Sequence, residues 1–137
     1  DGLKNALMTL RSSLRGKLLC VFGCGGDRDR KKRPEMGSIA SILADTVIIT
    51  SDNPRTEDPH QILDDVASGI SNNVEMIIEI DRGVAIQKAI FRALPDDIVL
   101  IAGKGHEDYQ ILKGETIRFD DREYARKALC SRLKNLR

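Results

Sequence analysis

Three short stretches of this 137-residue sequence combine charged side chains with glycine or proline: "GCGGDRDRKKRP", "TSDNPRTEDP" and "GKGHEDYQ". An arginine can bind a carboxylate or a phosphate through two parallel hydrogen bonds, and a glutamate can accept hydrogen bonds from an ammonium group. Arg28, Asn53, Arg55 and Glu107 therefore supply cations for carboxylates and an acid for an amine. Together these side chains could bind the carboxylate and the ammonium group of an amino acid, including an amino acid with more than one carboxylate.

The first stretch also invites a nucleotide-binding interpretation, because glycines after a buried strand can cradle phosphate. However, a G-x-G-x-x-G fingerprint that started at Gly23 would need glycine at the position of Arg28, and no G-x-x-x-x-G-K-[ST] motif occurs. A free-standing nucleotide-binding domain is therefore disfavoured. We expect Arg28 to be functional and most of the neighbouring lysines to be surface residues.

In the second stretch, turn formation explains Asp52, Asn53 and Pro54, since an Asx-turn followed by proline is a common loop after a strand. Turn chemistry leaves Arg55 unexplained. In the third stretch, glycine at Gly103 permits close approach of a ligand to the backbone. A simple hinge would also need glycines, but it would not need the titratable groups that follow; among these His106 alone is weak evidence.

The segments between these stretches alternate between strand and helix patterns. Continuous apolar runs predict buried parallel strands at 18–23, 46–50, 75–80 and 97–102. Helical spacing predicts helices from Leu3 to about Gly16, from Pro34, from an Asp58 cap, from an Asp81 cap and from about 121 to 136. "YQIL" and "ETIRF" flank "KGE" without a helix, which indicates a hairpin.

This order predicts a small Rossmann-like, doubly wound α/β domain with a mostly parallel sheet and a C-terminal antiparallel hairpin strand. Ligands of such sheets bind outside the carboxyl ends of the strands. The three polar stretches follow the first, second and fourth predicted strands. We therefore expect them to converge on one edge of the sheet.

Composition excludes several classes of function. The residues are 41% apolar, which suits one domain with a real core, and 22 basic against 21 acidic residues give a net charge of +1. Such a balance predicts neither nucleic-acid nor membrane binding. Three cysteines without an export signal suit a reducing, cytoplasmic compartment, with Cys20 packed in a strand and Cys130 on the last helix. Their spacing makes a metal site improbable, and we expect a monomer.

Taken together, "GCGGDRDRKKRPEMGSIA", "TSDNPRTEDP" and "AGKGHEDYQI" resemble the C-terminal domain of the Mur ligases of peptidoglycan synthesis. The resemblance runs from Asp1 to about the final helix, in the family's order and spacing. Within the family, "DNPR" is associated with members that add meso-diaminopimelate rather than lysine. By this resemblance, residues 1–16 are the end of a linker and the first helix, and residues 17–137 are the amino-acid-binding domain.

The resemblance implies an ATP-dependent amide ligase. ATP phosphorylates the D-glutamate side-chain carboxylate of UDP-MurNAc-L-Ala-D-Glu, the amine of diaminopimelate attacks the acyl phosphate, and ADP and phosphate leave as the amide forms. The C-terminal domain brings the amino acid and closes over a central domain that holds ATP and Mg²⁺. That central domain, its P-loop and the UDP-sugar domain are absent from this sequence. We therefore expect the chain alone to be inactive and assign it no catalytic residue.

The resemblance also assigns roles to single residues. Asp52 would shape its loop and contact the ligand, and Asp1 would contact the nucleotide as the end of a linker. The residues expected to hold meso-diaminopimelate are Arg28, Asp52, Asn53, Arg55, Gly103 and Glu107.

Two alternatives stay open: a non-catalytic Mur-ligase-like interaction module, and a lysine-adding relative. The polar set argues against a module and "DNPR" against a lysine-adding enzyme. One departure concerns the first stretch. The family usually reads "GDRDxGKRP", and we assign the missing glycine to Lys32, with a slightly altered loop and a retained ligand site.

Overall fold

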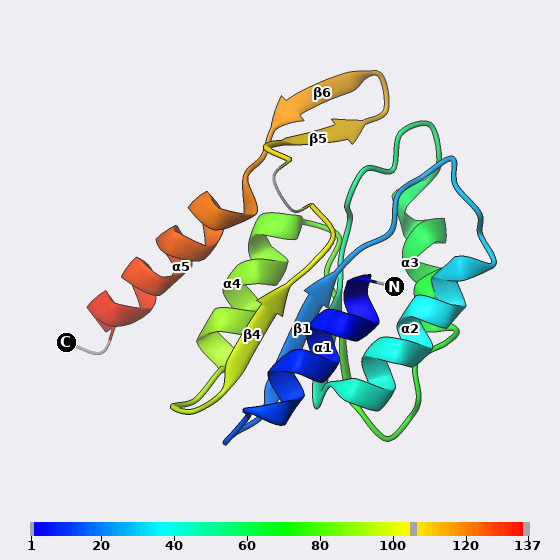
Figure 1. Cartoon of the computed structure of the whole chain (residues 1–137). Helices are drawn as coiled ribbons and strands as arrows, with labels where there is room; N and C mark the ends of the chain where they lie inside the picture. The colour runs from blue at the N-terminus through cyan, green and yellow to red at the C-terminus, as the bar shows by residue number, and fades with distance from the viewer. Residues whose placement is uncertain (1, 105–106, 136–137) are drawn as a thin grey trace.

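The computed structural model describes residues 2–104 and 107–135. Helices and strands alternate up to a hairpin and a last helix (Figure 1). In chain order the elements are α1 (Gly2–Ser12), β1 (Leu18–Phe22), α2 (Lys32–Leu43), β2 (Thr46–Ile49), α3 (Pro59–Ala67), β3 (Glu75–Ile78), α4 (Arg82–Arg92), β4 (Ile98–Ile101), β5 (Tyr109–Leu112), β6 (Glu115–Arg118) and α5 (Asp121–Asn135).

The four strands β1 to β4 form one parallel sheet in the order β3-β2-β1-β4. Cys20 in the central strand β1 pairs with Val47 of β2 on one side and Leu100 of β4 on the other. All residues of β1 and β2 are buried, whereas β3 is an edge strand with exposed residues. Since the strands are parallel, the loops that follow β1, β2 and β4 leave the same edge of the sheet.

Helices cover both faces of the sheet (Figure 1). Cys20 and Phe22 face a core cluster with α1, α2 and α3, to which Leu3 and Leu7 of α1 belong. Val21 faces a second cluster, which α4 and α5 complete. The alternation along β1 is the period-2 pattern of a strand buried on both faces. The prediction of a doubly wound α/β domain is confirmed.

Two helices begin at the expected capping residues, whereas α1 ends at Ser12 and not at about Gly16. Asp58 accepts a hydrogen bond from His60 N at 2.9 Å, and Asp81 accepts one from Val84 N at 3.1 Å. Helix α2, however, begins at Lys32 and not at Pro34. Proline fits there because the amides of a helix's first turn have no partner within the helix.

The predicted hairpin is present, but it forms its own two-stranded sheet and does not extend the parallel one. Backbone contacts tie it to the loop after β2, since Arg55 N donates to Ile111 O at 3.1 Å. Cys20 is buried in β1 and Cys130 is exposed on α5, as expected. None of the described helices is long and apolar enough to cross a bilayer.

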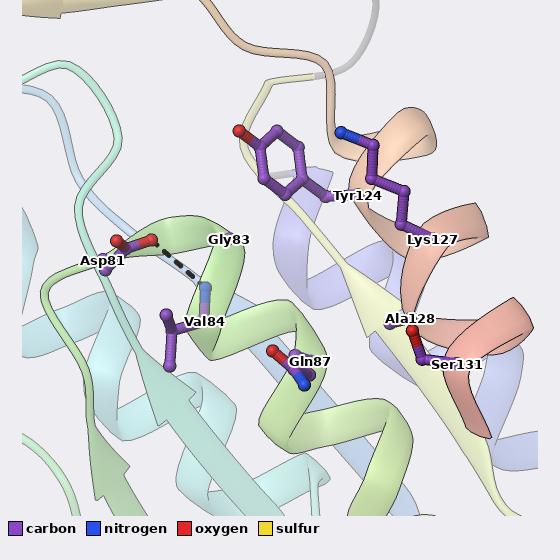
Figure 2. A pocket seen from close by; sticks show the side chains of 8 residues that line it. All are labelled: Asp81, Gly83, Val84, Gln87, Tyr124, Lys127, Ala128 and Ser131. Carbon is purple, nitrogen blue, oxygen red and sulfur yellow. Dashed lines mark hydrogen bonds between the residues drawn. The ribbon is translucent and has the colours of Figure 1, made fainter. Parts of the chain in front are cut away.

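A groove of about 320 Å³ lies between α4 and α5 (Figure 2). At its upper end Tyr124 packs so close to Gly83 that a Cβ on the glycine would lie 2.6 Å from the ring. Tyr124 also stacks on Phe119 with ring centroids 4.3 Å apart, and Lys127 lies 5.1 Å from the tyrosine ring centre. None of the predicted site residues that the structure describes lines this groove.

Candidate functional site

The loops after β1 and β2 are in direct contact at the carboxyl edge of the sheet. Gly26 N donates a hydrogen bond of 2.7 Å to Asn53 O. A Cβ built on Gly26 would lie 1.8 Å from Pro54 O, so only glycine fits at this position. The first two polar stretches of the sequence are thereby locked together.

A cleft of about 340 Å³ opens between these loops and the loop after β4. It brings together three of the predicted site residues, one from each loop: Arg28, Asp52 and Gly103. Gly103 has φ +117, a conformation that side chains disfavour, and a Cβ on it would lie 3.8 Å from Asp52 Oδ2. The convergence of the three loops, expected from the strand order, is confirmed.

Arg55 lies beside this cleft. Its backbone has φ 54, and its Nη1 lies 3.2 Å from Gly26 O and 3.4 Å from Asn53 O. A Cβ on Gly25 would lie 3.0 Å from Arg55 Nη1 and 3.6 Å from Arg28 Cγ, so the two arginines flank that glycine. Within residues 2–104 and 107–135 neither arginine is paired with a carboxylate, which leaves both charges available to a ligand.

Glu107 is fixed by Asn53, which is only 3% exposed. Asn53 Oδ1 accepts hydrogen bonds from Ile111 N at 2.8 Å and Lys104 Nζ at 3.2 Å, while Nδ2 donates to Glu107 Oε1 at 3.3 Å. Glu107 N in turn donates to Lys104 O at 2.8 Å. Asn53 therefore holds the carboxylate of Glu107, and Lys104 O holds its backbone.

The sequence patterns assign no role to Lys104, yet its ammonium group bonds to Asp52 and Asn53 of the candidate site. Its Nζ donates to Asp52 Oδ1 at 2.8 Å, to Asn53 Oδ1, and to Tyr109 O at 2.9 Å. Two flanking glycines gave a weak indication of a special lysine. Its burial could not be inferred without the position of Asp52.

Arg33 belongs to the cationic run of the first loop but is buried. It pairs with Glu57 at 2.5 Å and with Asp65 at 2.9 Å, and Nη2 donates to Gly25 O at 3.1 Å. The hydrogen bond from Arg33 lowers the pKa of Glu57. This arginine supports the glycine loop and also lines the cleft, with its guanidinium charge paired to the two carboxylates.

The residue that stands in place of the family's glycine in this loop is Lys31, and the assignment to Lys32 was wrong. Counted from Gly26, the pattern "GDRDxGKRP" places that glycine at Lys31 and not at Lys32. Lys31 has φ −67 and ψ −27, which any residue adopts, and Lys32 is the first residue of α2. A lysine at either position therefore needs no special backbone conformation.

A second buried arginine, Arg82, was missed as well. Its Nε and Nη2 donate to Asp121 at 2.7 and 2.8 Å, Nη1 donates to Ser51 O at 3.3 Å, and Nη2 donates to Ala102 O at 3.1 Å. It thus ties the carboxyl ends of β2 and β4 to the start of α5. No sequence signal distinguished it from an ordinary first-turn arginine.

The described residues show neither a free Gly26 amide for a phosphate nor a cluster of side chains for Mg²⁺. Gly26 N, which could have met a phosphate, is bonded to Asn53 O. Among residues 2–104 and 107–135 no group of three His, Cys, Asp or Glu side chains could hold a metal ion. The predicted nucleotide contact, Asp1, and the weak candidate His106 lie outside the described residues.

The structure is thus a parallel α/β domain with a cleft at the carboxyl edge of its sheet, and charged side chains are among those that line the cleft. The chain belongs to the Mur ligase family, since the family model described as "Mur ligase, glutamate ligase domain" matches residues 1–105. Within that family it is similar to the C-terminal domain of ligases named for diaminopimelate, as the following relatives show.

Two curated relatives carry the name UDP-N-acetylmuramoyl-L-alanyl-D-glutamate–2,6-diaminopimelate ligase. One, from Prochlorococcus marinus, is 71% identical over 129 residues, which are 94% of this chain and 26% of that protein. Another, from Thermosynechococcus vestitus, is 62% identical over 134 residues, 98% of this chain and 27% of that protein. The chain thus spans about a quarter of the length of these relatives.

A solved structure of a UDP-N-acetylmuramoyl-L-alanyl-D-glutamate–2,6-diaminopimelate ligase has the same fold. It superposes with a TM-score of 0.92 at 48% sequence identity, over 96% of this chain and 27% of that one. The similarity therefore includes α5 and the hairpin, which lie outside the match to the family model.

Proposed function

We propose that this chain is the amino-acid-binding domain of a ligase that joins meso-diaminopimelate to UDP-MurNAc-L-Ala-D-Glu in peptidoglycan synthesis. The observation that carries the proposal is that Arg28 lines the cleft and Arg55 lies beside it, both without a carboxylate partner among the described residues. Asn53, in the loop after β2, anchors the carboxylate of Glu107. The names of the relatives supply the identity of the ligand. We further propose that the full ligase is a cytoplasmic monomer.

Each end of meso-diaminopimelate carries one carboxylate and one ammonium group. In the proposed complex Arg28 and Arg55 bind carboxylate and Glu107 accepts from an ammonium group. Asp52 and Asn53 line the ligand from the loop after β2, and Gly103 lets it approach the backbone. Because L-lysine lacks the second carboxylate, it leaves one arginine unpaired, which favours diaminopimelate.

Among the described residues no group of three His, Cys, Asp or Glu side chains could hold Mg²⁺, and the Gly26 amide is already bonded. ATP and Mg²⁺ would then be held mainly by another domain of the ligase. The role of this domain is then to hold the diamino acid and to close on the ATP-binding domain, so that the amine reaches the activated carboxylate. Positioning of this kind is a major source of rate acceleration in two-substrate reactions.

The proposal is tested by a titration of the ¹⁵N-labelled 137-residue chain with meso-diaminopimelate and, in a parallel sample, with L-lysine. We expect chemical-shift changes for the amides of Asn53, Arg55 and Glu107, larger with diaminopimelate at equal concentration. Amides of α5 serve as an internal control and stay unchanged. Equal shifts with both ligands, or none up to the solubility limit of the ligand, would contradict the proposal.

A further inference from the structure

Lys104 is a fully enclosed cation beneath the candidate site. The residue is 3% exposed and its side chain 0% exposed. An ammonium group has three hydrogens to donate. All three have acceptors, since Nζ lies 2.8 Å from Asp52 Oδ1, 3.2 Å from Asn53 Oδ1 and 2.9 Å from Tyr109 O. Lys104 therefore has no hydrogen left with which to bind a ligand.

The contacts of Lys104 determine which way the Asn53 amide points. Both groups on one side of that amide, Lys104 Nζ and Ile111 N, are donors, so the oxygen has to face them. The amide nitrogen is thereby directed at the carboxylate of Glu107. Without the lysine, the Asn53 oxygen would lose its charged donor, and only the bonds with Ile111 N and Glu107 would oppose rotation of the Asn53 side chain.

Lys104 also balances the charge of Asp52. The Asp52 carboxylate lines the same cleft as Arg28. An unpaired carboxylate at this position would repel the carboxylates of a diamino acid and would compete for the arginine. Its ion pair with the lysine leaves the positive charge of the arginines in excess, which is the condition for recognising two carboxylates.

From this geometry we infer that Lys104 is a positioning residue for recognition of the diamino acid. It does not touch the ligand; it acts by orienting the Asn53 amide toward Glu107 and by neutralising Asp52. The inference rests on the proposed function, since it concerns the same cleft and the same ligand. Among the described residues, the Lys104 ammonium group bonds to Asp52, Asn53 and Tyr109, and Asp52 lines the cleft.

The test uses the full-length ligase that contains this domain, with Lys104→Met as the variant. Lys88→Met is the matched control, because Lys88 is an exposed lysine of α4 that pairs with Glu79 away from the cleft. We expect Lys104→Met to raise the KM for meso-diaminopimelate about tenfold or more, the effect of losing a charge-assisted buried contact. The KM for ATP should not change, and Lys88→Met should match the wild type.

A double-mutant cycle separates positioning from a general loss of structure. If Lys104 acts through Asn53, then adding Lys104→Met to an Asn53→Ala variant should raise the KM much less than it does in the wild type. A merely structural role would lower the active fraction, and so the apparent kcat, and would leave the KM for diaminopimelate unchanged. Full additivity, or a wild-type KM for Lys104→Met, would overturn the inference.

Asn53→Asp covers the case in which Lys104→Met does not fold. Aspartate retains oxygens that accept from Lys104 and Ile111 N, but it replaces the donor toward Glu107 with an acceptor. We expect a folded ligase with a raised KM for diaminopimelate, and a wild-type KM would refute the role given to the amide. If the wild-type ligase does not use diaminopimelate, the proposed function fails and this inference fails with it. If the wild-type ligase uses diaminopimelate and the variants have the same KM for it, this inference alone fails.

Discussion

Asn53 donates a hydrogen bond of 3.3 Å to the carboxylate of Glu107, 54 positions away in the sequence. The bond joins the loop after β2 to the loop after β4, which are not neighbouring strands of the sheet. Two groups proposed to contact the same amino acid are thus held in place before any ligand arrives. Such preorganisation reduces the entropy lost on binding.

The variant Glu107→Gln removes the negative charge of this side chain but keeps an acceptor for its hydrogen bond with Asn53. Glutamine keeps an oxygen that can accept from Asn53 Nδ2, so the loops should stay joined and the melting temperature of the domain should hardly change. The attraction for an ammonium group is lost, and we expect the KM for diaminopimelate in the full ligase to rise about tenfold or more. Glu115→Gln, in the exposed strand β6, is the control; an unchanged KM for Glu107→Gln would remove Glu107 from the site.

Arg55→Lys tests the proposed recognition of a carboxylate. Lysine keeps the positive charge and the β-carbon, so the backbone at φ 54 is equally strained in both proteins. It loses the planar group that can bond to Gly26 O and still present two parallel donors to a ligand. Steady-state kinetics of the full ligase should give a KM for diaminopimelate raised about tenfold or more, with the KM for ATP unchanged. Arg92→Lys, on the exposed side of α4, should behave as wild type, and the same result for Arg55→Lys would disprove the assignment.

Thr56→Ala is expected to weaken the fold of the first loop. The Thr56 hydroxyl lies 2.7 and 2.9 Å from the carboxylate oxygens of Asp27, a residue with φ 56. Loss of this exposed bond should lower the free energy of unfolding of the chain by about 0.5–1 kcal/mol, measured by urea denaturation. Thr56→Ser keeps the hydroxyl and should retain most of the stability. Equal loss in both variants would show that the methyl group, and not the hydroxyl, matters.

The stability of the domain should fall in acid because of Asp65. Hydrogen bonds from Arg30, and then from Arg33 and Gln61, lower the pKa of Asp65 from its usual 3.8 to about 2. Since the folded state favours the ionised form, this contribution is fully present above the unfolded pKa and is lost as the pH falls through 3.8 toward 2. Unfolding at a series of pH values should show Asp65→Asn less stable at pH 7 and less sensitive to acid below pH 4. Parallel curves for both proteins would contradict this origin of the acid sensitivity.

The parts of the fold that could be predicted from the sequence are those that local patterns determine. The apolar runs around Cys20 and Val47 gave the buried strands, and Asp58 and Asp81 gave the starts of two helices. The meeting of the three polar loops followed from the rule that parallel strands end at a common edge. That Arg28, Asp52 and Gly103 line one cleft is a consequence of this rule.

The buried cations could not be predicted in this way. Lys104, Arg33 and Arg82 stand in charged or glycine-rich surroundings that look the same in sequence whether the side chain is solvated or enclosed. Each finds its partners through contacts between distant segments, as Arg82 does with Asp121, 39 positions away. Arg28 has no carboxylate partner among the described residues, whereas Arg33 pairs with Glu57, in the loop before α3, and with Asp65 of α3. This difference depends on where that loop and α3 place the two carboxylates.

The central claim is that this cleft recognises a diamino acid with two carboxylates. The most direct measurement is the kcat/KM of the full-length ligase for meso-diaminopimelate and for L-lysine, with UDP-MurNAc-L-Ala-D-Glu and ATP saturating. The second carboxylate should favour diaminopimelate by about a hundredfold, in line with one charge-assisted bidentate contact. Equal values of kcat/KM, or a preference for L-lysine, would contradict the account.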